Sequence, residues 1–187
     1  GGHFAAQKDL LYKLVTEAPE AIQWLSDLGV EFDKAPDGTM ITTHGGGTSR
    51  KRMHAAKDYS GAEIMRTLRD EVFNRGIPVV DFTSAIELIL DENGRAAGAV
   101  LMNMETKELL VARAKTVIIA TGGSTGNVYF RTMIDARRGV EYDCTSGDPF
   151  CPKDASGEIA AMAIGACLGD IANQVIGDSF LTKAAMI

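Results

Sequence analysis

The feature that most constrains the fold is a short apolar run that leads directly into a glycine-rich turn. Apolar residues at positions 117–120 are followed by Thr121, Gly122 and Gly123. A continuous apolar run of this length, bounded by turn signals, is typical of a strand buried on both faces of a parallel sheet. The glycines let the backbone approach a bulky group at the carboxyl end of that strand, where open α/β sheets bind their ligands. An ordinary strand and turn is the alternative that the local pattern leaves open.

The composition fits one globular domain, or a large part of one, and excludes several other classes of protein. The chain has 187 residues, of which 45% are hydrophobic, so it can bury a substantial core. Its net charge is −6 and its cations are scattered apart from residues 50–52, which argues against the basic face that a nucleic-acid partner would need. No apolar run approaches the length of a membrane span, and no signal peptide is visible.

The cysteines and the first residues of the chain carry two further expectations. Cys144, Cys151 and Cys167 form a sparse, odd set that suits a reducing compartment better than a disulfide framework, so we expect a cytoplasmic protein. Cys144 and Cys151 lack a second cysteine pair and are interpreted as unremarkable thiols, with a metal site as the alternative. The chain begins with two glycines and a histidine rather than an initiator methionine, and we expect it to be an internal piece of a longer protein.

Residues 1–76 are predicted to form helices joined by loops. Leucine and valine recur at helical spacing over residues 8–18. Pro19 is expected to open a second helix, because the first turn of a helix does not need its N–H group. Gly29 is expected to terminate that second helix.

Short strands and loops are predicted after these helices. Residues 30–32 and 40–43 favour short strands on either side of an Asp-Gly turn. The glycine-rich basic loop 44–52 is interpreted as a solvated surface loop, with contact to a phosphate or carboxylate as the alternative. The histidines share no metal-ligand spacing, so no zinc site is predicted.

A capping box marks the start of the best-defined helix. Ser60 is expected at the N-cap and Glu63 at the third helical position, where each side chain satisfies the backbone N–H of the other residue. Apolar residues then recur on one face until Gly76 and Pro78 end the helix.

After this helix the hydrophobic pattern changes to that of strands. A strong hairpin signal, Asp-Glu-Asn-Gly, joins two strands, and a second turn follows at residues 104–107. The predicted strands are 78–82, 84–90, 97–102 and 108–112. The last three of these form an antiparallel β-meander that leads into the apolar run.

Residues 127–153 show no clear periodicity and are predicted to be irregular. Asp154 or Ser156 is expected to cap a last helix that runs to about Leu168. The small side chains of this helix would permit close approach to a sheet or to a ligand.

A set of separated motifs recurs in a fixed order over residues 1–170. The set comprises a glycine pair before the first helical segments, the sequence 54–61 before the next helix, the hairpin 90–100, the turn 120–123 and the helix 156–170. In order and spacing it resembles the flavoprotein subunits of fumarate reductase and succinate dehydrogenase, and their relative L-aspartate oxidase. The turn Ala-Thr-Gly-Gly occurs in many FAD enzymes, whereas the ordered set is more specific.

The resemblance implies an α/β fold. This fold is a partial FAD-binding, Rossmann-like domain with a parallel sheet, an inserted antiparallel β-meander and flanking helices. The whole chain, 1–187, would be one such partial domain. It would consist of a helical and loop insertion (1–76), the β-meander with the buried strand (77–126), and an irregular segment with a helix (127–187).

The resemblance also implies FAD as the cofactor and hydride transfer between a substrate and the flavin. In that family the adenosine end of FAD lies against the strand matching residues 84–86 and near the turn at 120–123. Backbone groups and small side chains at these places suit adenine, and the start of a helix near Ser156 favours a negative charge. The candidate cofactor-binding residues are Ser84, Ala85, Ile86, Ala120, Thr121, Gly122, Gly123 and Ser156, and no metal ligand is assigned.

The chain also departs from the family pattern. The Gly-x-Gly-x-x-Gly fingerprint of such domains is not present and would lie before Gly1. Ser156 stands where the family has an aspartate. Residues 171–187 contain no histidine where the family places its substrate histidine, so no catalytic residue is assigned.

The expected partners follow from the same resemblance. They are a small-molecule substrate of the dicarboxylate class and an electron-transfer subunit, with the protein in the cytoplasm or at the cytoplasmic face of a membrane complex. An unpaired position in the central sheet would expose a strand edge, so self-association of the chain is expected. The alternative is a non-catalytic structural or partner-binding module that keeps the flavoprotein fold.

Overall fold

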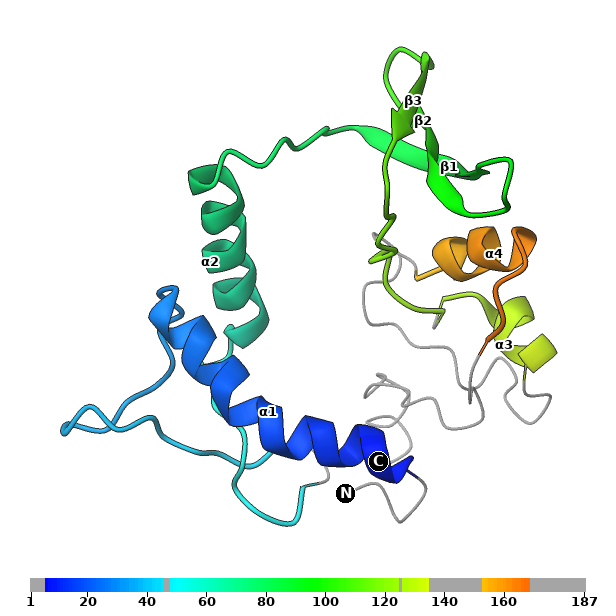
Figure 1. The fold of residues 1–187 in the computed structure, drawn as a ribbon. Coiled ribbons are helices and arrows are strands. Elements are labelled where there is room, and N and C mark those ends of the chain that lie inside the picture. The colour runs from blue at the N-terminus through cyan, green and yellow to red at the C-terminus, as the bar shows by residue number, and fades with distance from the viewer. Residues whose placement is uncertain (1–5, 46–47, 125, 135–152, 169–187) are drawn as a thin grey trace, which may run out of the picture. The chain divides into compact units, whose positions relative to one another are not determined.

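The structure, a computed structural model, describes residues 6–45, 48–124, 126–134 and 153–168 (Figure 1). The chain divides into two compact units, Gly1–Val79 and Val80–Ile187. The first unit contains the helices α1 (Lys8–Asp27) and α2 (Ser60–Asn74). The second contains the strands β1 (Thr83–Leu90), β2 (Ala96–Asn103) and β3 (Leu109–Arg113), and the helices α3 (Val128–Ile134) and α4 (Ser156–Ala163).

Helix α1 runs through Pro19 without interruption. It spans 20 residues with Pro19 inside it, so the prediction that Pro19 opens a second helix is wrong. A proline in a helix interior removes one hydrogen bond. Strong helix formers flank it here, among them Ala18 and Ala21, and they favour one continuous helix over two short ones.

Gly29 ends helix α1, as predicted. It has a φ of 105°, in the left-handed region that favours glycine. Its N–H donates to the carbonyl of Ser26, and the N–H of Val30 donates to the carbonyl of Leu25, both at 3.0 Å. This pair of bonds is the Schellman motif, which satisfies carbonyls that a helix end would otherwise leave unpaired. Helix α2 ends with an equivalent pair of bonds, in which Gly76 donates to Phe73 and Ile77 donates to Val72.

The residues that follow α1 form the small core of the first unit. Val30 is 2% exposed and Phe32 is 4% exposed. The short strands predicted at 30–32 and 40–43 are wrong, because the described residues form only isolated single-residue bridges in this region. The N–H of Val30 is already bonded to the end of α1, and the N–H of Phe32 donates to Val30 (3.0 Å), so neither group is left for a strand ladder.

Helix α2 is confirmed, but the capping box that predicted its start is wrong. Ser60 is the first helical residue and Tyr59 is the N-cap, with no hydrogen bond from a capping side chain. The hydroxyl of Ser60 instead accepts a hydrogen bond from the N–H of Ala56 (3.0 Å). The Glu63 carboxylate accepts one from the N–H of Glu31 (3.2 Å) and so ties α2 to the segment after α1.

The antiparallel meander is confirmed. The strands β1, β2 and β3 form a sheet in that order, and both neighbouring pairs are antiparallel (Figure 1). The predicted hairpin turn forms, with Asp91 Oδ1 accepting from the N–H groups of Asn93 and Arg95, both at 2.9 Å. The strand predicted at 78–82 is absent, because Phe82 has a φ of 52°, which a strand does not accommodate.

Strands β2 and β3 come into close contact at Gly98. This residue has a φ of 151°, and a Cβ at its position would collide with the carbonyl oxygen of Ala112 on β3. The pairing of β1 with β2 is irregular beside it, between Ile89 and Leu90. Glycine is therefore required at this point of the sheet.

The buried parallel strand predicted at residues 117–120 does not form. Ile118 is 85% exposed and Ile119 is 43% exposed. Within the described ranges, no strand pairs with this run. Its residues are apolar enough for a central strand, but a central strand needs a neighbour on each side. The described sheet is therefore antiparallel.

Two helices complete the described part of the second unit. Helix α3 lies in a region that the sequence predicted to be irregular. Helix α4 contacts β1 and begins at Ser156, as expected. It ends at Ala163, before the predicted Leu168, because a Schellman pair of bonds closes it at Gly165.

Candidate cofactor site

The glycine-rich turn after the apolar run is open to solvent. Ala120, Thr121 and Gly122 are exposed, and Gly122 has a φ of 90°. Among the described residues, nothing accepts a hydrogen bond from the N–H groups of these three. The turn therefore presents backbone donors with little side-chain bulk around them.

Backbone hydrogen bonds join this turn to the segment that precedes α4. The N–H of Ala155 donates to the carbonyl of Gly123 (3.1 Å). The N–H of Gly126 donates to the carbonyl of Lys153 (2.8 Å). The two segments are far apart in the sequence, and these bonds bring the turn to the first residues of α4.

A side chain that the sequence did not single out adds to this connection. Asn127 Nδ2 donates to the carbonyl of Asp154 (2.7 Å), and Asn127 Oδ1 accepts from the N–H of Phe130 (2.9 Å). Asn127 therefore caps helix α3 and binds the segment before α4 with the same carboxamide. The available signal was an asparagine just before a run of helix-compatible residues, which is a preferred N-cap position.

The start of α4 has an unusual backbone. Its N-cap is Ala155, which has a φ of 62° and is 1% exposed, so the prediction of Asp154 or Ser156 as the cap is wrong. Asp154 Oδ1 instead accepts from the N–H of Ser156 (2.9 Å). Hydrogen bonds from the Ser156 side chain and then from its backbone N–H lower the pKa of Asp154. This turn keeps the Asp154 carboxylate charged beside the helix terminus.

Gly157 lets the first turn of α4 lie directly against the apolar run. It is buried, and a Cβ at its position would lie 2.5 Å from Ile119 Cγ2 and closer still to Thr121 Oγ1. A larger residue would displace one of these side chains or the helix itself. This close approach occurs at Gly157, whereas the small residues from which it was predicted lie later in the segment, where a Cβ at Gly165 would meet no atom within 4 Å.

The predicted strand residues lie in β1. Ser84 and Ala85 are paired with β2, whereas Ile86 falls in an irregularity of the pairing and is 47% exposed. Since α4 contacts β1, these residues belong to the same unit as the turn and Ser156. In the described part of the chain, no hydrogen bond links β1 directly to the turn.

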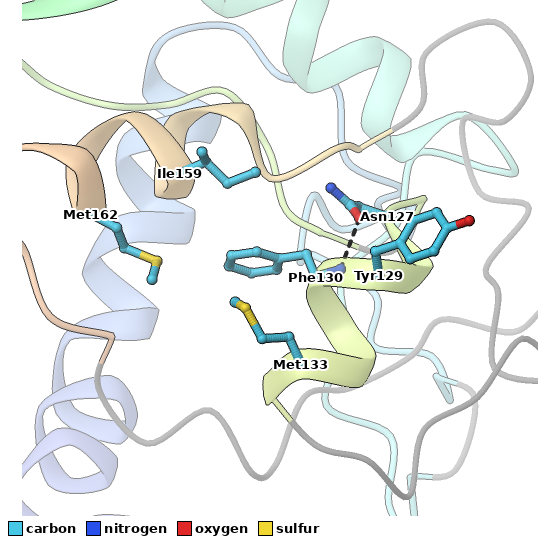
Figure 2. A pocket seen from close by; sticks show the side chains of 6 residues that line it. All are labelled: Asn127, Tyr129, Phe130, Met133, Ile159 and Met162. Atoms are coloured by element: carbon cyan, nitrogen blue, oxygen red, sulfur yellow. Dashed lines mark hydrogen bonds between the residues drawn. The ribbon is translucent and has the colours of Figure 1, made fainter.

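A pocket of about 350 Å³ lies between α3 and α4 (Figure 2). None of the described residues that line it is charged, and Figure 2 shows Phe130, Met133 and Met162 directed into it. Such walls suit an apolar group rather than a phosphate. The lining residues are Asn127, Tyr129, Phe130, Met133, Ile159 and Met162.

The residues around the turn fit one end of a dinucleotide. The unpaired N–H groups of the turn suit ring nitrogens and oxygens as acceptors, and the small residues leave room for a planar group. The side chain of Lys153 runs beside the turn, since a Cβ on Gly122 would lie 3.6 Å from Lys153 Cγ. The turn and the start of α4 therefore provide backbone donors with little side-chain bulk around them, which is what a planar ring with acceptor atoms needs.

Other kinds of site find no support in the described residues. Within them, no group of histidine, cysteine and acidic residues is arranged to hold a metal ion. Cys144 and Cys151 lie outside the described residues. No helix in the described ranges has both the length and the apolar character to cross a membrane.

Comparison with known proteins places this chain in a family. The profile of the FAD binding domain matches residues 1–172. L-aspartate oxidase of Streptomyces coelicolor is 36% identical over 129 residues, which are 67% of this chain and 22% of that protein. The 8-methylmenaquinol:fumarate reductase flavoprotein subunit of Wolinella succinogenes is 31% identical over 132 residues, 71% of this chain and 21% of that protein.

The solved structures agree with the sequences. The open conformation of a flavocytochrome c3 fumarate reductase is similar with a TM-score of 0.66 and 26% identity, over 81% of this chain and 25% of that chain. The chain thus spans about a fifth to a quarter of the length of these relatives. The resemblance inferred from the sequence motifs, and FAD as the cofactor that it implied, are confirmed. The chain belongs to the FAD binding domain family.

Proposed function

We propose that this chain carries the part of an FAD-dependent oxidoreductase that receives the adenosine end of FAD. The observation that carries the proposal is the turn from Ala120 to Gly123, which is exposed at residues 120–122 and is joined by the carbonyl of Gly123 to the N–H of Ala155, the residue before α4. Its free N–H groups are the donors, and Ser156 and the first turn of α4 lie next to them. The strand segment 84–86 is proposed as a further wall of the site, because it belongs to β1, which contacts α4.

The apolar run at 117–120 is proposed to complete a parallel, Rossmann-like sheet. Its composition is that of a central strand, and Ile118 is 85% exposed in the described structure. The relatives are four to five times longer than their match to this chain, judged from the matched shares of 22% and 21%. Neighbouring strands from such additional sequence would bury the run on both faces.

For the whole protein we propose hydride transfer between a small substrate and flavin, in the cytoplasm or at the cytoplasmic face of a membrane complex. When bound, FAD supplies the redox chemistry, and the protein supplies binding and orientation. L-aspartate oxidase and fumarate reductase, by their names, act on dicarboxylates, which supports a substrate of that class and a partner that exchanges electrons. The described residues hold the cofactor and are not assigned to the chemical step.

Retention of flavin tests the proposal directly. The chain is incubated with FAD, free dye is removed, and the visible absorbance of the protein is recorded. Retained flavin bands support the proposal, and a colourless chain contradicts it for these residues.

A pair of glycine variants makes the test specific to the turn. Gly122→Val places a β-branched residue at a φ of 90° in the turn and is expected to abolish retention. Gly38→Val makes the same change at a φ of 87°, in the first unit and with no atom within 4 Å of its Cβ position, so it is expected to keep the flavin. Flavin bands of equal strength in both variants would show that the turn is not the binding element.

A non-catalytic docking module is the second candidate. It is favoured by the exposure of large apolar side chains on β3, where Leu109 is 64% and Val111 62% exposed. A colourless chain that forms stable assemblies would support this reading instead.

A further inference from the structure

We infer that Asn127 is a positioning residue, whose carboxamide sets the FAD-binding turn in place against the start of α4. The inference rests on the proposed function, because it takes the turn as the element that binds FAD. It concerns a residue outside that element, which acts through the neighbouring backbone.

The partners of Asn127 determine how its carboxamide is oriented. Phe130 offers an N–H, which only the oxygen can accept, at 2.9 Å (dashed in Figure 2). Asp154 offers a carbonyl oxygen, which only the nitrogen can reach as a donor, at 2.7 Å. A reversed carboxamide would set donor against donor and acceptor against acceptor. Both ends of the side chain are therefore engaged, each in the one arrangement that the backbone permits.

The hydrogen bond to Asp154 stands in the middle of the connection between the two segments. Lys153 accepts from the N–H of Gly126, and Ala155 donates to the carbonyl of Gly123. Asp154 lies between these two residues in the chain, and its carbonyl is bound by the side chain of Asn127. Three consecutive residues before α4 are thus each attached to the segment that contains the turn.

The backbone of Asn127 is itself fixed relative to the turn. Its N–H donates to the carbonyl of Ser124 (3.0 Å), and Ser124 is 5% exposed. The carboxamide projects from this fixed point to Asp154. Loss of the hydrogen bond from Asn127 Nδ2 to Asp154 would remove the central link between the two segments and let the turn shift relative to α4.

The substitution Asn127→Asp separates the two roles of the side chain. Aspartate still accepts from the N–H of Phe130 and is an equally good N-cap, so α3 keeps its cap. It cannot donate to Asp154, and it places a charged oxygen against that carbonyl. Asn127→Ala removes both bonds.

Asn103→Asp is the matched control. Asn103 Oδ1 accepts from the N–H groups of Glu105 (2.9 Å) and Thr106 (3.0 Å), and no described residue accepts a hydrogen bond from its Nδ2. The control therefore makes the same chemical change in the same unit without removing a donor bond.

Two measurements follow the variants: the dissociation constant of FAD, and residue-specific amide hydrogen exchange by NMR. For Asn127→Asp we expect about tenfold weaker FAD binding, faster exchange at Gly126 and Ala155, and unchanged exchange at Phe130. For Asn127→Ala we expect faster exchange at Phe130 as well. Asn103→Asp is expected to match the wild type in both measurements.

A purely structural role would give a different result. If the substitution only unfolded part of the population, the apparent affinity would fall in proportion to the folded fraction. A chain that circular dichroism shows to be almost fully folded would then bind FAD almost as well as the wild type. A tenfold loss in a folded Asn127→Asp variant therefore supports positioning.

Either of two results would overturn the inference. One is FAD affinity in Asn127→Asp equal to that of the wild type, and the other is unchanged exchange at Gly126 and Ala155. If the wild type itself retains no FAD, the proposed function fails for this chain, and the exchange data alone decide whether Asn127 holds the turn in place.

Discussion

The close approach of β3 to Gly98 predicts that Gly98→Ala lowers the free energy of unfolding by far more than an ordinary glycine substitution does. A Cβ at Gly98 would strike the carbonyl oxygen of Ala112 and lie 3.1 Å from Cα of Arg113. These are backbone atoms of β3, so no side-chain rotation relieves the contact. Gly94, in the turn between β1 and β2, is the matched control, because it has a φ of 73° and no atom lies within 4 Å of its Cβ position.

The expected loss of stability can be worked out for both variants. For Gly94→Ala we expect about 1 kcal/mol, because left-handed alanine costs about 1–2 kcal/mol and the lower entropy of the unfolded chain returns about 0.4–1 kcal/mol. For Gly98→Ala, the backbone conformation costs about 1–3 kcal/mol and the crowding against β3 about 1–3 kcal/mol more. The expected total is about 3–4 kcal/mol, roughly 2 kcal/mol or more above the control.

Amide hydrogen exchange of the meander measures this difference. A gap of about 2 kcal/mol makes the amides of β2 and β3 exchange roughly thirtyfold faster in Gly98→Ala than in Gly94→Ala. The amides of α2, in the other unit, serve as the internal reference and are expected to be unchanged. Equal exchange rates of the β2 amides in the two variants would refute the reasoning, because they would show that β3 can move away from the added Cβ without loss of stability.

Three further predictions follow from charge, packing and the sheet edge. A hydrogen bond from Arg66, and then one from the backbone N–H of Glu31, lower the pKa of Glu63 from 4.5 to about 2. The ionised carboxylate therefore stabilises the fold above about pH 4.5, and this stabilisation is lost as the pH falls towards 2. Glu63→Gln should remove that dependence from urea midpoints measured across this range, and an unaltered pH profile would contradict it. Gly157→Ala is expected to cost about 1–3 kcal/mol and to weaken FAD binding, whereas Gly61→Ala, inside α2 with no atom within 4 Å of its Cβ position, should leave flavin titrations unchanged. Val111→Lys puts a charge on the exposed edge strand β3. If the chain self-associates through this edge, as expected, the variant should have a lower mass than the wild type by light scattering, and equal masses would count against an edge contact.

The parts of the fold that were predictable are those whose signals and partners lie close together in the sequence. The hairpin after β1 follows from Asp91, whose carboxylate binds N–H groups two and four residues ahead. The end of α1 follows from Gly29, whose partners lie within the last turn of the helix. Such short-range bonds depend on few residues, and local sequence is enough to specify them.

Two of the predictions that failed depend on distant partners. Ser60 and Glu63 have the pattern of a capping box, but the Glu63 carboxylate accepts instead from Glu31, 32 residues away. The apolar run at 117–120 has the composition of a central strand, but a strand also needs neighbours, and no local pattern provides them. In these two cases the local signal is present, but the outcome depends on a contact or a neighbour that the local sequence does not specify.

The candidate site was also predictable only in part from the sequence. The turn at 120–123 and the helix from Ser156 were recognisable as motifs, and hydrogen bonds do join the two segments. The role of Asn127 was not recognisable, because its partner Asp154 is 27 residues away. The asparagine predicts a helix cap, whereas its second bond depends on how the chain folds back.

The way in which α1, α2 and α4 end also bears on how the chain is made. Each helix closes through bonds from the two residues that follow its C-cap to carbonyls in its own last turn. The partners of each helix end therefore lie within two residues of its C-cap, so that forming the end requires no downstream segment. During vectorial synthesis, α1 and α2 can reach their final lengths before the meander leaves the ribosome. The boundaries of these helices are then set in the order of translation, while the cofactor site, which joins residues 120–127 to 153–157, can form only after α4 has emerged.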